Sequence, residues 1–157
     1  MMLRTHRPDV VLRAAQAGDA DALADIVAAS AEHLTQHGDY ADLVAGDAAA
    51  IAATLTGNEK QFVMLLNDTI VGLATLIRYQ PGIFGLGYWI GAAASGQGVT
   101  GAAVRRLVEH AVSDHGATEV WAGIRATNIP SIRLVQRLGF TQEREAETHL
   151  SFVLRTP

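Results

Sequence analysis

Apolar residues along this chain follow two spacings, and each spacing predicts a different kind of element. Short apolar runs bounded by turn residues are typical of buried strands, whereas apolar residues three or four positions apart are typical of helices. The first spacing predicts seven strands, at residues 10–13, 62–66, 69–79, 83–90, 120–124, 140–145 and 149–154. Asn67-Asp68 and Pro81-Gly82 supply tight turns between the second, third and fourth of these strands.

The second spacing predicts four helices, which begin near residues 18, 47, 100 and 128. In the first helix, apolar residues recur at helical spacing from Leu23 to Leu34. A looser stretch with Gly38 and Gly46 separates it from the second helix, for which Asp47 is a favourable N-cap. The third helix spans residues 100–114, and the last one runs from 128 to a closing glycine at 139.

The order of these elements defines the fold class. Two helices follow the first strand, three strands then run in hairpin order, and a strand between two helices leads to a terminal hairpin. Such an order favours an α/β (α+β) protein with a mixed, mostly antiparallel seven-stranded sheet flanked by about four helices. The 157 residues fit a single domain, 1–157. Gly85 and Gly87, inside a strand, predict a bulge or a close approach of backbones.

Composition narrows the possible functions. The formal net charge of -4 argues against nucleic acid as the partner, because binding to a duplex requires clustered Lys and Arg. The absence of cysteine excludes disulfides, thiolate metal sites and a cysteine nucleophile. No apolar run approaches the length of a membrane span, and the first nine residues have no hydrophobic region of a signal peptide behind them. We therefore expect a cytoplasmic protein that does not bind membranes.

One glycine-rich segment, residues 95–101, carries the strongest chemical signal. Its sequence, Ser-Gly-Gln-Gly-Val-Thr-Gly, lies between a strand and an amphipathic helix. The first amides of a helix lack intrahelical partners and present donors to an anion, so the segment is typical of a diphosphate site. The same letters match the dinucleotide fingerprint G-x-G-x-x-G, but that motif normally follows the first strand and precedes an acidic residue, neither of which holds here. A purely structural glycine turn is the remaining alternative.

Three motifs together give a family resemblance. They are Gly-Tyr-Trp-Ile at 87–90, the glycine-rich loop at 96–101, and Asn-Ile-Pro-Ser at 128–131 followed by Leu-Gly-Phe at 138–140. In these motifs and in element order, the chain resembles the GNAT superfamily, and within it the branch that acetylates N-termini of ribosomal proteins. The resemblance implies the GNAT fold, acetyl-CoA as co-substrate and a primary amine as acceptor. Ser95 and Thr100 depart from the loop pattern Gln/Arg-x-x-Gly-x-Gly/Ala, which predicts weaker rather than absent cofactor binding.

The resemblance also implies roles for individual residues. The oxyanion donor of the family is a backbone amide that maps to Trp89, Ile90 and Gly91. Many members place a tyrosine where this chain has Val135, which leaves Ser131 as the catalytic proton donor to the CoA sulfur, with Asn128 as a hydrogen-bonding partner of the cofactor. The alternative is that Asn128 and Ser131 only cap and start a helix. The cofactor-binding residues implied in total are Trp89, Ile90, Gly91, Gly96, Gln97, Gly98, Val99, Thr100, Gly101, Asn128 and Ser131.

The general base is not identified by the sequence. Residues 69–108 contain no Asp, Glu or His, and the candidates elsewhere are Glu119, Glu143, Glu145, Glu147 and His149. An α-amine is partly neutral near pH 8 whereas a lysine amine is not, so a site without an obvious base favours an α-amine of a peptide or protein. The alternatives are a small amine such as an aminoglycoside or polyamine, and a non-catalytic CoA-binding sensor or scaffold. We expect a monomer or homodimer.

Two histidines have a spacing that could serve a metal ion. His33 and His37 are four residues apart, so on one helix they would share a face and could bind a metal. No third ligand stands at a recognisable spacing, which favours a solvated helix face over a metal site. We therefore expect no bound metal.

Overall fold

The computed structural model describes residues 1–55 and 60–157, and within them the strands form one eight-stranded sheet. The strand order is β1-β2-β3-β4-β5-β6-β8-β7, in which only β5 and β6 pair in parallel. The strands are β1 (Met2–Arg4), β2 (Val10–Ala14), β3 (Lys60–Leu66), β4 (Thr69–Gln80), β5 (Ile83–Ile90), β6 (Glu119–Arg125), β7 (Thr141–Glu145) and β8 (His149–Arg155). The expected mixed, mostly antiparallel sheet is confirmed.

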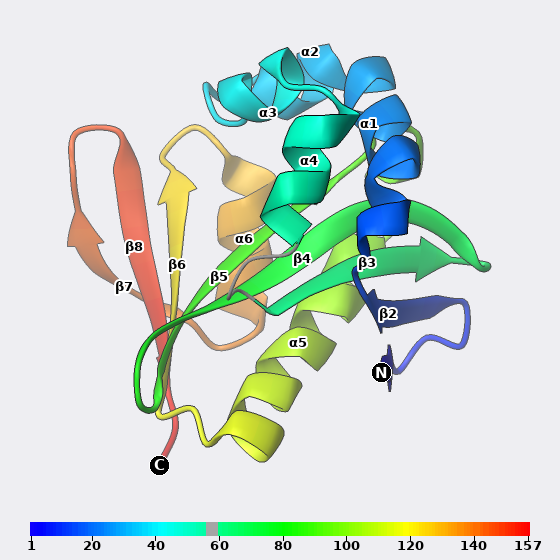
Figure 1. Cartoon of the computed structure of the whole chain (residues 1–157). Helices are drawn as coiled ribbons and strands as arrows, with labels where there is room; N and C mark the ends of the chain where they lie inside the picture. Colours follow the sequence, from blue (N-terminus) through cyan, green and yellow to red (C-terminus); the bar gives the residue numbers. More distant parts are fainter. Residues whose placement is uncertain (56–59) are drawn as a thin grey trace.

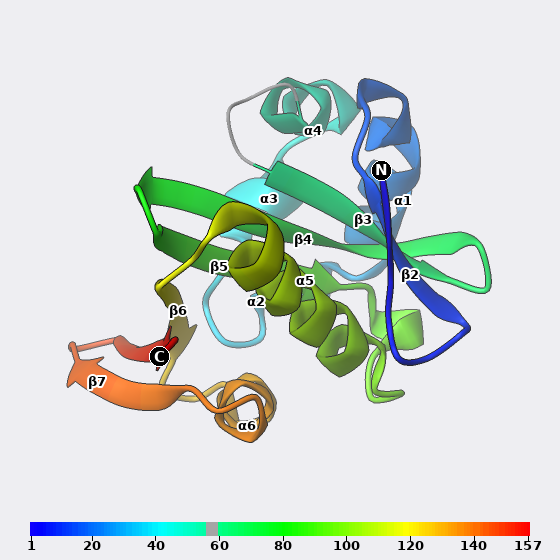
Figure 2. The ribbon, with the colours of Figure 1, turned by 90° about the horizontal axis from the view of Figure 1, so that it is seen from below.

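Helices cover both faces of the sheet (Figures 1 and 2). Helices α1 to α4 lie on one face, and α5 and α6 lie on the other. The helices are α1 (Ala20–Ala29), α2 (Ala31–Thr35), α3 (Ala41–Ala45), α4 (Ala48–Leu55), α5 (Val99–His115) and α6 (Ile129–Arg137), with 3-10 turns η1 (Ala17–Asp19) and η2 (Ala92–Ala94). Across the two described segments, no helix is both long and apolar enough to traverse a lipid bilayer.

The element count differs from the prediction at three places. Strand β1 was missed because it has three residues and buries one side chain, Leu3, which lies opposite Leu12 of β2. The helix expected to continue from Leu23 to Leu34 is interrupted at Ser30, whose backbone is not helical. The stretch expected to be loose contains the short helix α3. Asp47 accepts a hydrogen bond from the amide of Ala50 at 2.9 Å, consistent with the expected N-cap of α4.

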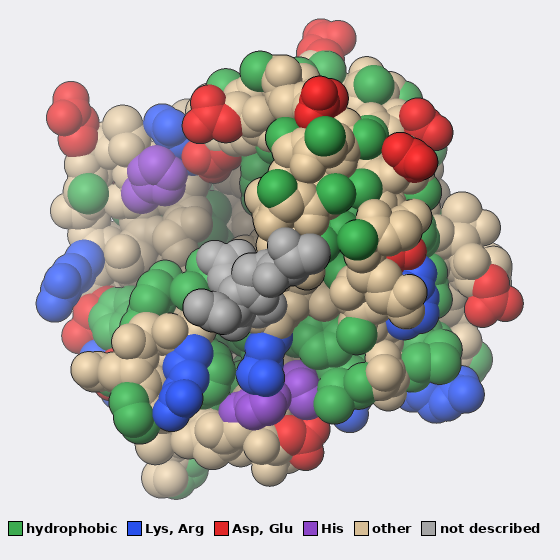
Figure 3. Space-filling view, viewed as in Figure 1, with side chains coloured by type: hydrophobic (Ala, Val, Ile, Leu, Met, Phe, Trp, Pro, Cys, Tyr) green, Lys and Arg blue, Asp and Glu red, His purple; other side chains and the backbone are tan. Residues whose placement is uncertain are grey.

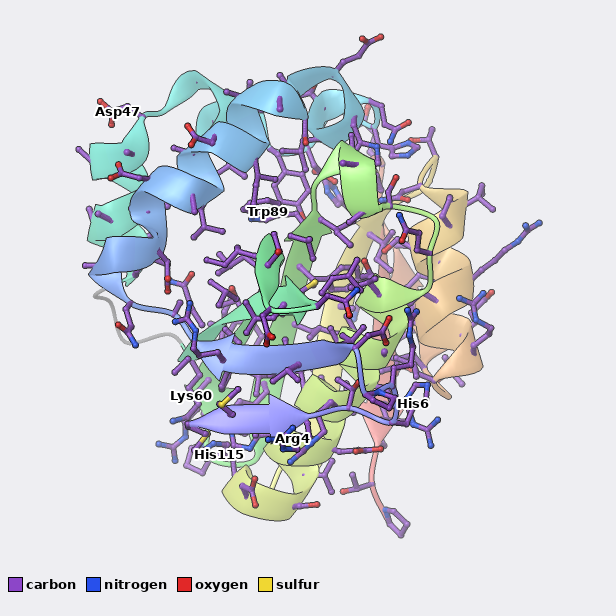
Figure 4. All side chains as sticks on the ribbon, turned by 90° about the vertical axis from the view of Figure 1, so that its right-hand side faces the viewer. Arg4, His6, Asp47, Lys60, Trp89 and His115 are labelled. Carbon is purple, nitrogen blue, oxygen red and sulfur yellow. The ribbon has the colours of Figure 1, made fainter. Side chains whose placement is uncertain are left out.

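The central strands separate two hydrophobic clusters. On the α5 side, Phe62 and Met64 of β3 pack against small and branched residues of α5 such as Ala103 and Leu107. On the α1 side, alternate residues of the same strand pack with Leu23, Val27 and Trp89. This alternation follows from the two-residue period of a strand, which sends neighbouring side chains to opposite faces. Trp89 is consequently a core residue under α1, and Figure 4 shows it directed toward that helix.

Strands β5 and β6 share only a short ladder. Ile83–Gly85 pairs with 119–121, and no further pairing between these strands follows among the described residues. Beyond this point β6 continues beside β8 while β5 continues beside β4, so the two strands diverge (Figure 1). The space between the diverging halves of β5 and β6 is called the opening below. Helix α6 follows β6 directly and lies on the α5 side of it.

Glycines permit close approaches near the opening. The expected bulge or close approach of backbones is found at neither glycine of β5, because an added Cβ at Gly85 would meet only the side chain of Tyr79 and one at Gly87 would meet nothing within 4 Å. Register shifts lie elsewhere, at Met64/Leu65 and in β4 before Gln80. The tightest backbone contact is at Gly72 of β4, where an added Cβ would collide with the carbonyl oxygen of Trp89.

We therefore expect Gly72→Ala to lower the free energy of unfolding by about 1–3 kcal/mol, the usual cost of forcing an added methyl into a packed site. The matched control is Gly87→Ala on the neighbouring strand, where the methyl has room. That variant should be unchanged or up to about 1 kcal/mol more stable, because alanine restricts the unfolded chain. Urea denaturation of both variants measures the difference, and equal stabilities would contradict the contact at Gly72.

Candidate active site

The edge of β5 at the opening offers a backbone hydrogen-bond donor. The amide of Gly91 donates to the carbonyl oxygen of Val71 at 2.8 Å and is therefore directed toward β4. Because amides alternate in direction along an antiparallel strand, the amide of Ile90 is directed to the other side, into the opening. Of the three amides in the predicted segment Trp89–Gly91, that of Ile90 thus faces the opening as a hydrogen-bond donor.

Tyr88 links this strand to α6. Its hydroxyl lies 2.5 Å from Oγ of Ser131, although the two residues are 43 positions apart in the sequence. Burial raises the pKa of Tyr88 and the hydrogen bond to Ser131 lowers it in part, with a net increase. Tyr88 is therefore protonated at neutral pH and can donate to Ser131, which leaves the Ser131 proton for another acceptor. No motif in the sequence indicates this pair. The one available signal is that side chains alternate between the two faces of a strand, which places Tyr88 and Trp89 on opposite faces of β5.

A second tyrosine reaches the same strand from the helical side. The hydroxyl of Tyr40 donates to the carbonyl oxygen of Tyr88 at 2.5 Å. A residue of a strand directs its carbonyl to the same side as its amide, so this carbonyl also faces the opening. Burial is the main cause that raises the pKa of Tyr40, which keeps its hydroxyl a donor. Tyr40 was not among the predicted site residues, and its backbone has an unusual positive φ of 65°.

The start of α6 fixes the position of Ser131. The side chain of Asn128 accepts a hydrogen bond from the amide of Ser131 at 3.3 Å, as an N-cap does, and Pro130 stands in the first turn. Asn128 therefore caps α6, and this cap positions the serine beside Tyr88, while the contact of Asn128 with the cofactor stays a prediction. Val135, one turn further along the helix, is fully buried and has no polar atom to contribute.

The glycine-rich loop has the geometry of an anion site. Gly96 and Gly98 both have φ of 76°, a left-handed conformation that favours glycine. Helix α5 begins at Val99, so the amides of residues 99–101 lack acceptors within the helix. The side chain of Val99 is 1% exposed and anchors this helix end in the core. Only the backbone of Val99 can therefore take part in binding.

Hydrogen bonds within the chain hold the first residues of the loop and the residues that precede it. The hydroxyl of Ser95 donates to the carbonyl oxygen of Ala92, and the side-chain amide of Gln97 donates to that of Ala93. The amide of Ala92 in turn donates to the buried hydroxyl of Ser30 at 2.9 Å. The break between α1 and α2 at Ser30 thus supports the loop from the opposite face of the sheet.

Charged residues gather where the connection between α2 and α3 meets the ends of β6 and β8. Nε of Arg125 donates to Oδ1 of Asp39 at 3.0 Å, and Nε2 of His149 lies 3.5 Å from the same oxygen. Tyr40, which reaches the opening, follows Asp39 directly in the chain. We call Asp39, Arg125 and His149 the entrance cluster. Figure 3 shows the surface hollowed between the β7–β8 hairpin and the helical side, with acidic, basic and histidine side chains at the rim.

The structure ranks the candidate bases. Glu119 and Glu143 both pair with Arg155, and Arg155 lowers the pKa of Glu143. Glu119 also lies opposite Ile83, at the closed end of the β5–β6 ladder. Glu145 and Glu147 are exposed at the β7–β8 hairpin. Of the predicted candidates, His149 is the one that belongs to the entrance cluster.

A separate histidine cluster lies at the other end of α5. Nδ1 of buried His110 is 2.5 Å from Oδ2 of Asp114, and its Nε2 is 3.1 Å from Nε2 of His115. A cavity of about 290 Å³ adjoins these rings and Lys60 (Figure 4). At 1.5 Å rise per residue, His110 stands roughly 15–20 Å along α5 from the glycine-rich loop, so this cavity is not part of the opening.

The two histidines with metal-ligand spacing do not share a helix. His33 lies in α2, which ends at Thr35, so the helical spacing does not extend to His37. His37 instead approaches the hydroxyl of Thr127 at 3.3 Å. Within residues 1–55 and 60–157, no group of three or more His, Asp or Glu side chains is arranged to hold a metal ion.

Comparisons with known proteins agree with this geometry. A family model described as an acetyltransferase (GNAT) domain matches residues 9–141. Similar solved structures include RimL, a ribosomal L7/L12 alpha-N-protein acetyltransferase in complex with coenzyme A, at 19% identity and a TM-score of 0.88, over 99% of this chain and 98% of that one. RimJ of Mycobacterium smegmatis, in complex with CoA-disulfide, is 21% identical with a TM-score of 0.83, over 99% of this chain and 87% of the other.

A third structure, from Salmonella typhimurium, is described as an acetyltransferase that modifies the N-terminal serine of ribosomal protein L7/L12. It is 17% identical with a TM-score of 0.84 and covers 100% of both chains. The search of curated proteins gave no match. Likeness at these identities shows the fold, and the family model spans most of the sequence. The chain belongs to the GNAT acetyltransferase family.

Proposed function

We propose that this protein transfers an acetyl group from acetyl-CoA to the α-amine of a peptide or protein in a ternary complex. The observation that carries the proposal is the arrangement on one side of β5. The free amide of Ile90, the Tyr88–Ser131 pair and the glycine-rich loop at the end of the same strand line one path. An acyl group, a thiol leaving group and a diphosphate are the three parts of acetyl-CoA that such a path would bind.

The loop would bind the diphosphate of the cofactor. The amides at the start of α5 and the positive end of its dipole favour an anion, and the glycine conformations let the backbone approach it. The pantetheine arm of the cofactor would then run back along β5 into the opening. This direction brings the thioester toward Ile90 and Ser131.

The chemistry follows from the polar groups of the opening. The neutral amine attacks the thioester carbon, and the amide of Ile90 stabilises the oxyanion that develops on the carbonyl oxygen. The carbon–sulfur bond then breaks, and the hydroxyl of Ser131 donates its hydrogen bond to the departing thiolate. Tyr88 donates to Ser131 and so keeps that proton directed at the sulfur. The proton lost by the attacking nitrogen balances the proton gained by CoA.

The entrance cluster supports an α-amine as acceptor. His149 can accept a proton from the incoming amine, directly or through water, and Asp39 would stabilise the imidazolium that forms. The β7–β8 hairpin carries the exposed carboxylates of Glu145 and Glu147, and such carboxylates attract an ammonium group. The ribosomal N-terminal acetyltransferases among the similar structures act on this class of acceptor.

We propose a cytoplasmic location, and a monomer or homodimer remains a prediction.

The first prediction concerns the cofactor loop. Gly98→Val should weaken binding of acetyl-CoA at least tenfold, because a side chain is strained at φ of 76° and would stand within 3.1 Å of Nη1 of Arg7. Gly123→Val on β6 is the control, since its added Cβ meets nothing within 4 Å. Isothermal titration calorimetry measures both affinities. Unchanged binding by the Gly98 variant would contradict the placement of the diphosphate.

The second prediction concerns the proton donor. Ser131→Ala should lower kcat about 100-fold, the low end of general acid catalysis, with little change in affinity for acetyl-CoA. Tyr88→Phe should lower kcat less, and the double variant should lose no more than Ser131→Ala, because Tyr88 acts through the serine.

Two controls accompany these variants. Tyr79→Phe removes the hydroxyl of a 62% exposed tyrosine and should leave kcat unchanged. Thermal melting checks that Ser131→Ala keeps its fold, because the residue lies at the start of α6. A folded Ser131→Ala with full turnover would show that water or another group supplies the proton.

The third prediction concerns the acceptor. A peptide that carries both a free N-terminus and a lysine should be acetylated first at the N-terminus at neutral pH, because an α-amine in a peptide has a pKa of about 7.7–8.0 and a lysine side chain one of about 10.4. Mass spectrometry locates the acetyl group. Lysine modified first would overturn the prediction, and thiol release with aminoglycosides or polyamines but not with peptides would favour the small-amine alternative.

A further inference from the structure

The glycine-rich loop contains no charge of its own. From Tyr79 to Val104 the sequence has no Lys, Arg, His, Asp or Glu. A diphosphate carries several negative charges, which backbone amides and a helix dipole neutralise only in part. Ser95 supplies no cation, because its side chain is a neutral hydroxyl that already donates to the carbonyl oxygen of Ala92. Any cation at the bound diphosphate must therefore come from another element.

Arg7 brings a cation to the loop from the β1–β2 connection. Its Nη1 donates to the carbonyl oxygen of Gln97 at 2.6 Å, across 90 residues of sequence. The same nitrogen lies 3.1 Å from the position that a Cβ would occupy on Gly98. The guanidinium thus lies against the loop at the residue that caps α5.

The conformation of Arg7 is fixed by its surroundings. Nε and Nη2 donate to the two carboxylate oxygens of Asp9, at 3.1 and 2.8 Å, in a bidentate ion pair. The backbone amide of Arg7 donates to the hydroxyl of Thr5 at 3.1 Å, and this hydroxyl also lies 2.9 Å from the carbonyl oxygen of Arg7. These bonds leave Nη1 as the nitrogen that faces the loop, and one of its two N–H groups goes to Gln97. The second is left for a ligand.

The neighbouring surface is also basic. A cavity of about 280 Å³ lies where the β1–β2 connection passes α5, on the side where Figure 4 labels Arg4 and His6. Arg105 and Arg106 line it as well, and Glu109 is its one carboxylate among the described residues, paired with Arg105 at 3.4 Å. The potential around Arg7 therefore favours an anion even though Asp9 offsets its own charge.

We propose that Arg7 is a positioning residue of the cofactor loop and the cation that meets the diphosphate of bound acetyl-CoA. It holds the loop through Gln97 and directs the remaining N–H of Nη1 at a phosphate oxygen. The proposal rests on the proposed function for the place of the cofactor. It assigns to the β1–β2 connection a role that no motif in the sequence indicates.

The test compares two arginines in matched settings. Arg7→Met removes the cation from the loop. The control, Arg13→Met, removes an arginine whose side chain is 27% exposed, against 30% for Arg7. Arg13 also forms a bidentate pair with an aspartate, Asp19. Calorimetry with CoA should show about a tenfold loss of affinity for Arg7→Met, equivalent to about 1.4 kcal/mol, and less than a twofold change for Arg13→Met. Arg7→Lys should fall between Arg7→Met and the parent, because it keeps the charge but cannot hold Asp9 and Gln97 together.

A second acetyl donor distinguishes the loss of a contact with the diphosphate from a general loss of activity or fold. S-acetylpantetheine carries the thioester but no diphosphate, so its kcat/KM should be the same for Arg7→Met and the parent, while KM for acetyl-CoA rises about tenfold and kcat stays within twofold. Three results would overturn the proposal. They are an equal loss of kcat/KM with both acetyl donors in Arg7→Met, an equal loss of affinity for CoA in Arg7→Met and Arg13→Met, and an unchanged Kd for CoA in Arg7→Met. Failure of the parent to bind CoA would instead contradict the proposed function.

Discussion

The parting of β5 and β6 after three paired residues is the constraint on which the rest of the site depends. A parallel ladder that continued would satisfy the amide of Ile90 and the carbonyl of Tyr88 with hydrogen bonds from β6. Because the ladder stops, these groups face the opening, and one of them is bonded instead by Tyr40. The divergence also separates α6 from β5. The side chain of Tyr88 spans this gap and reaches the hydroxyl of Ser131. Backbone chemistry and side-chain chemistry at the site thus have one geometric origin.

Contacts from β4 and from the α1–α2 junction keep that geometry. Gly72 of β4 has no side chain, so β4 can lie close to the backbone of β5 at Trp89. Just after β5, the amide of Ala92 donates a hydrogen bond to the hydroxyl of Ser30, between α1 and α2. An ordinary side chain at Gly72 or an unbroken helix through Ser30 would displace the end of β5. Features that look like defects, a glycine in a strand and a break in a helix, therefore maintain the position of the loop.

The sequence predicts much of the fold and only part of the site. Strong local signals, such as the glycines of the loop and the Asn–Pro start of α6, locate elements correctly because turn and cap chemistry acts over a few residues. β1 was missed because three residues are too few to show a period, and the first helix was extended through Ser30 because the acceptor role of that hydroxyl depends on a residue 62 positions away. Tyr40, Tyr88, Asp39 and Arg7 reach the site through contacts of the same long range, which no local pattern encodes.

The edges of the sheet restrict how this protein can associate. β1 forms one edge and offers three residues, and β7 forms the other with five exposed residues that include Glu143, Arg144 and Glu145. Short strands and charged side chains at an edge oppose the addition of another strand, since a docking chain would find few free backbone groups or would bring charges together. Two copies of this protein cannot readily join their sheets into one continuous sheet. Contact through helices or loops would instead leave the order of the eight described strands complete within each copy.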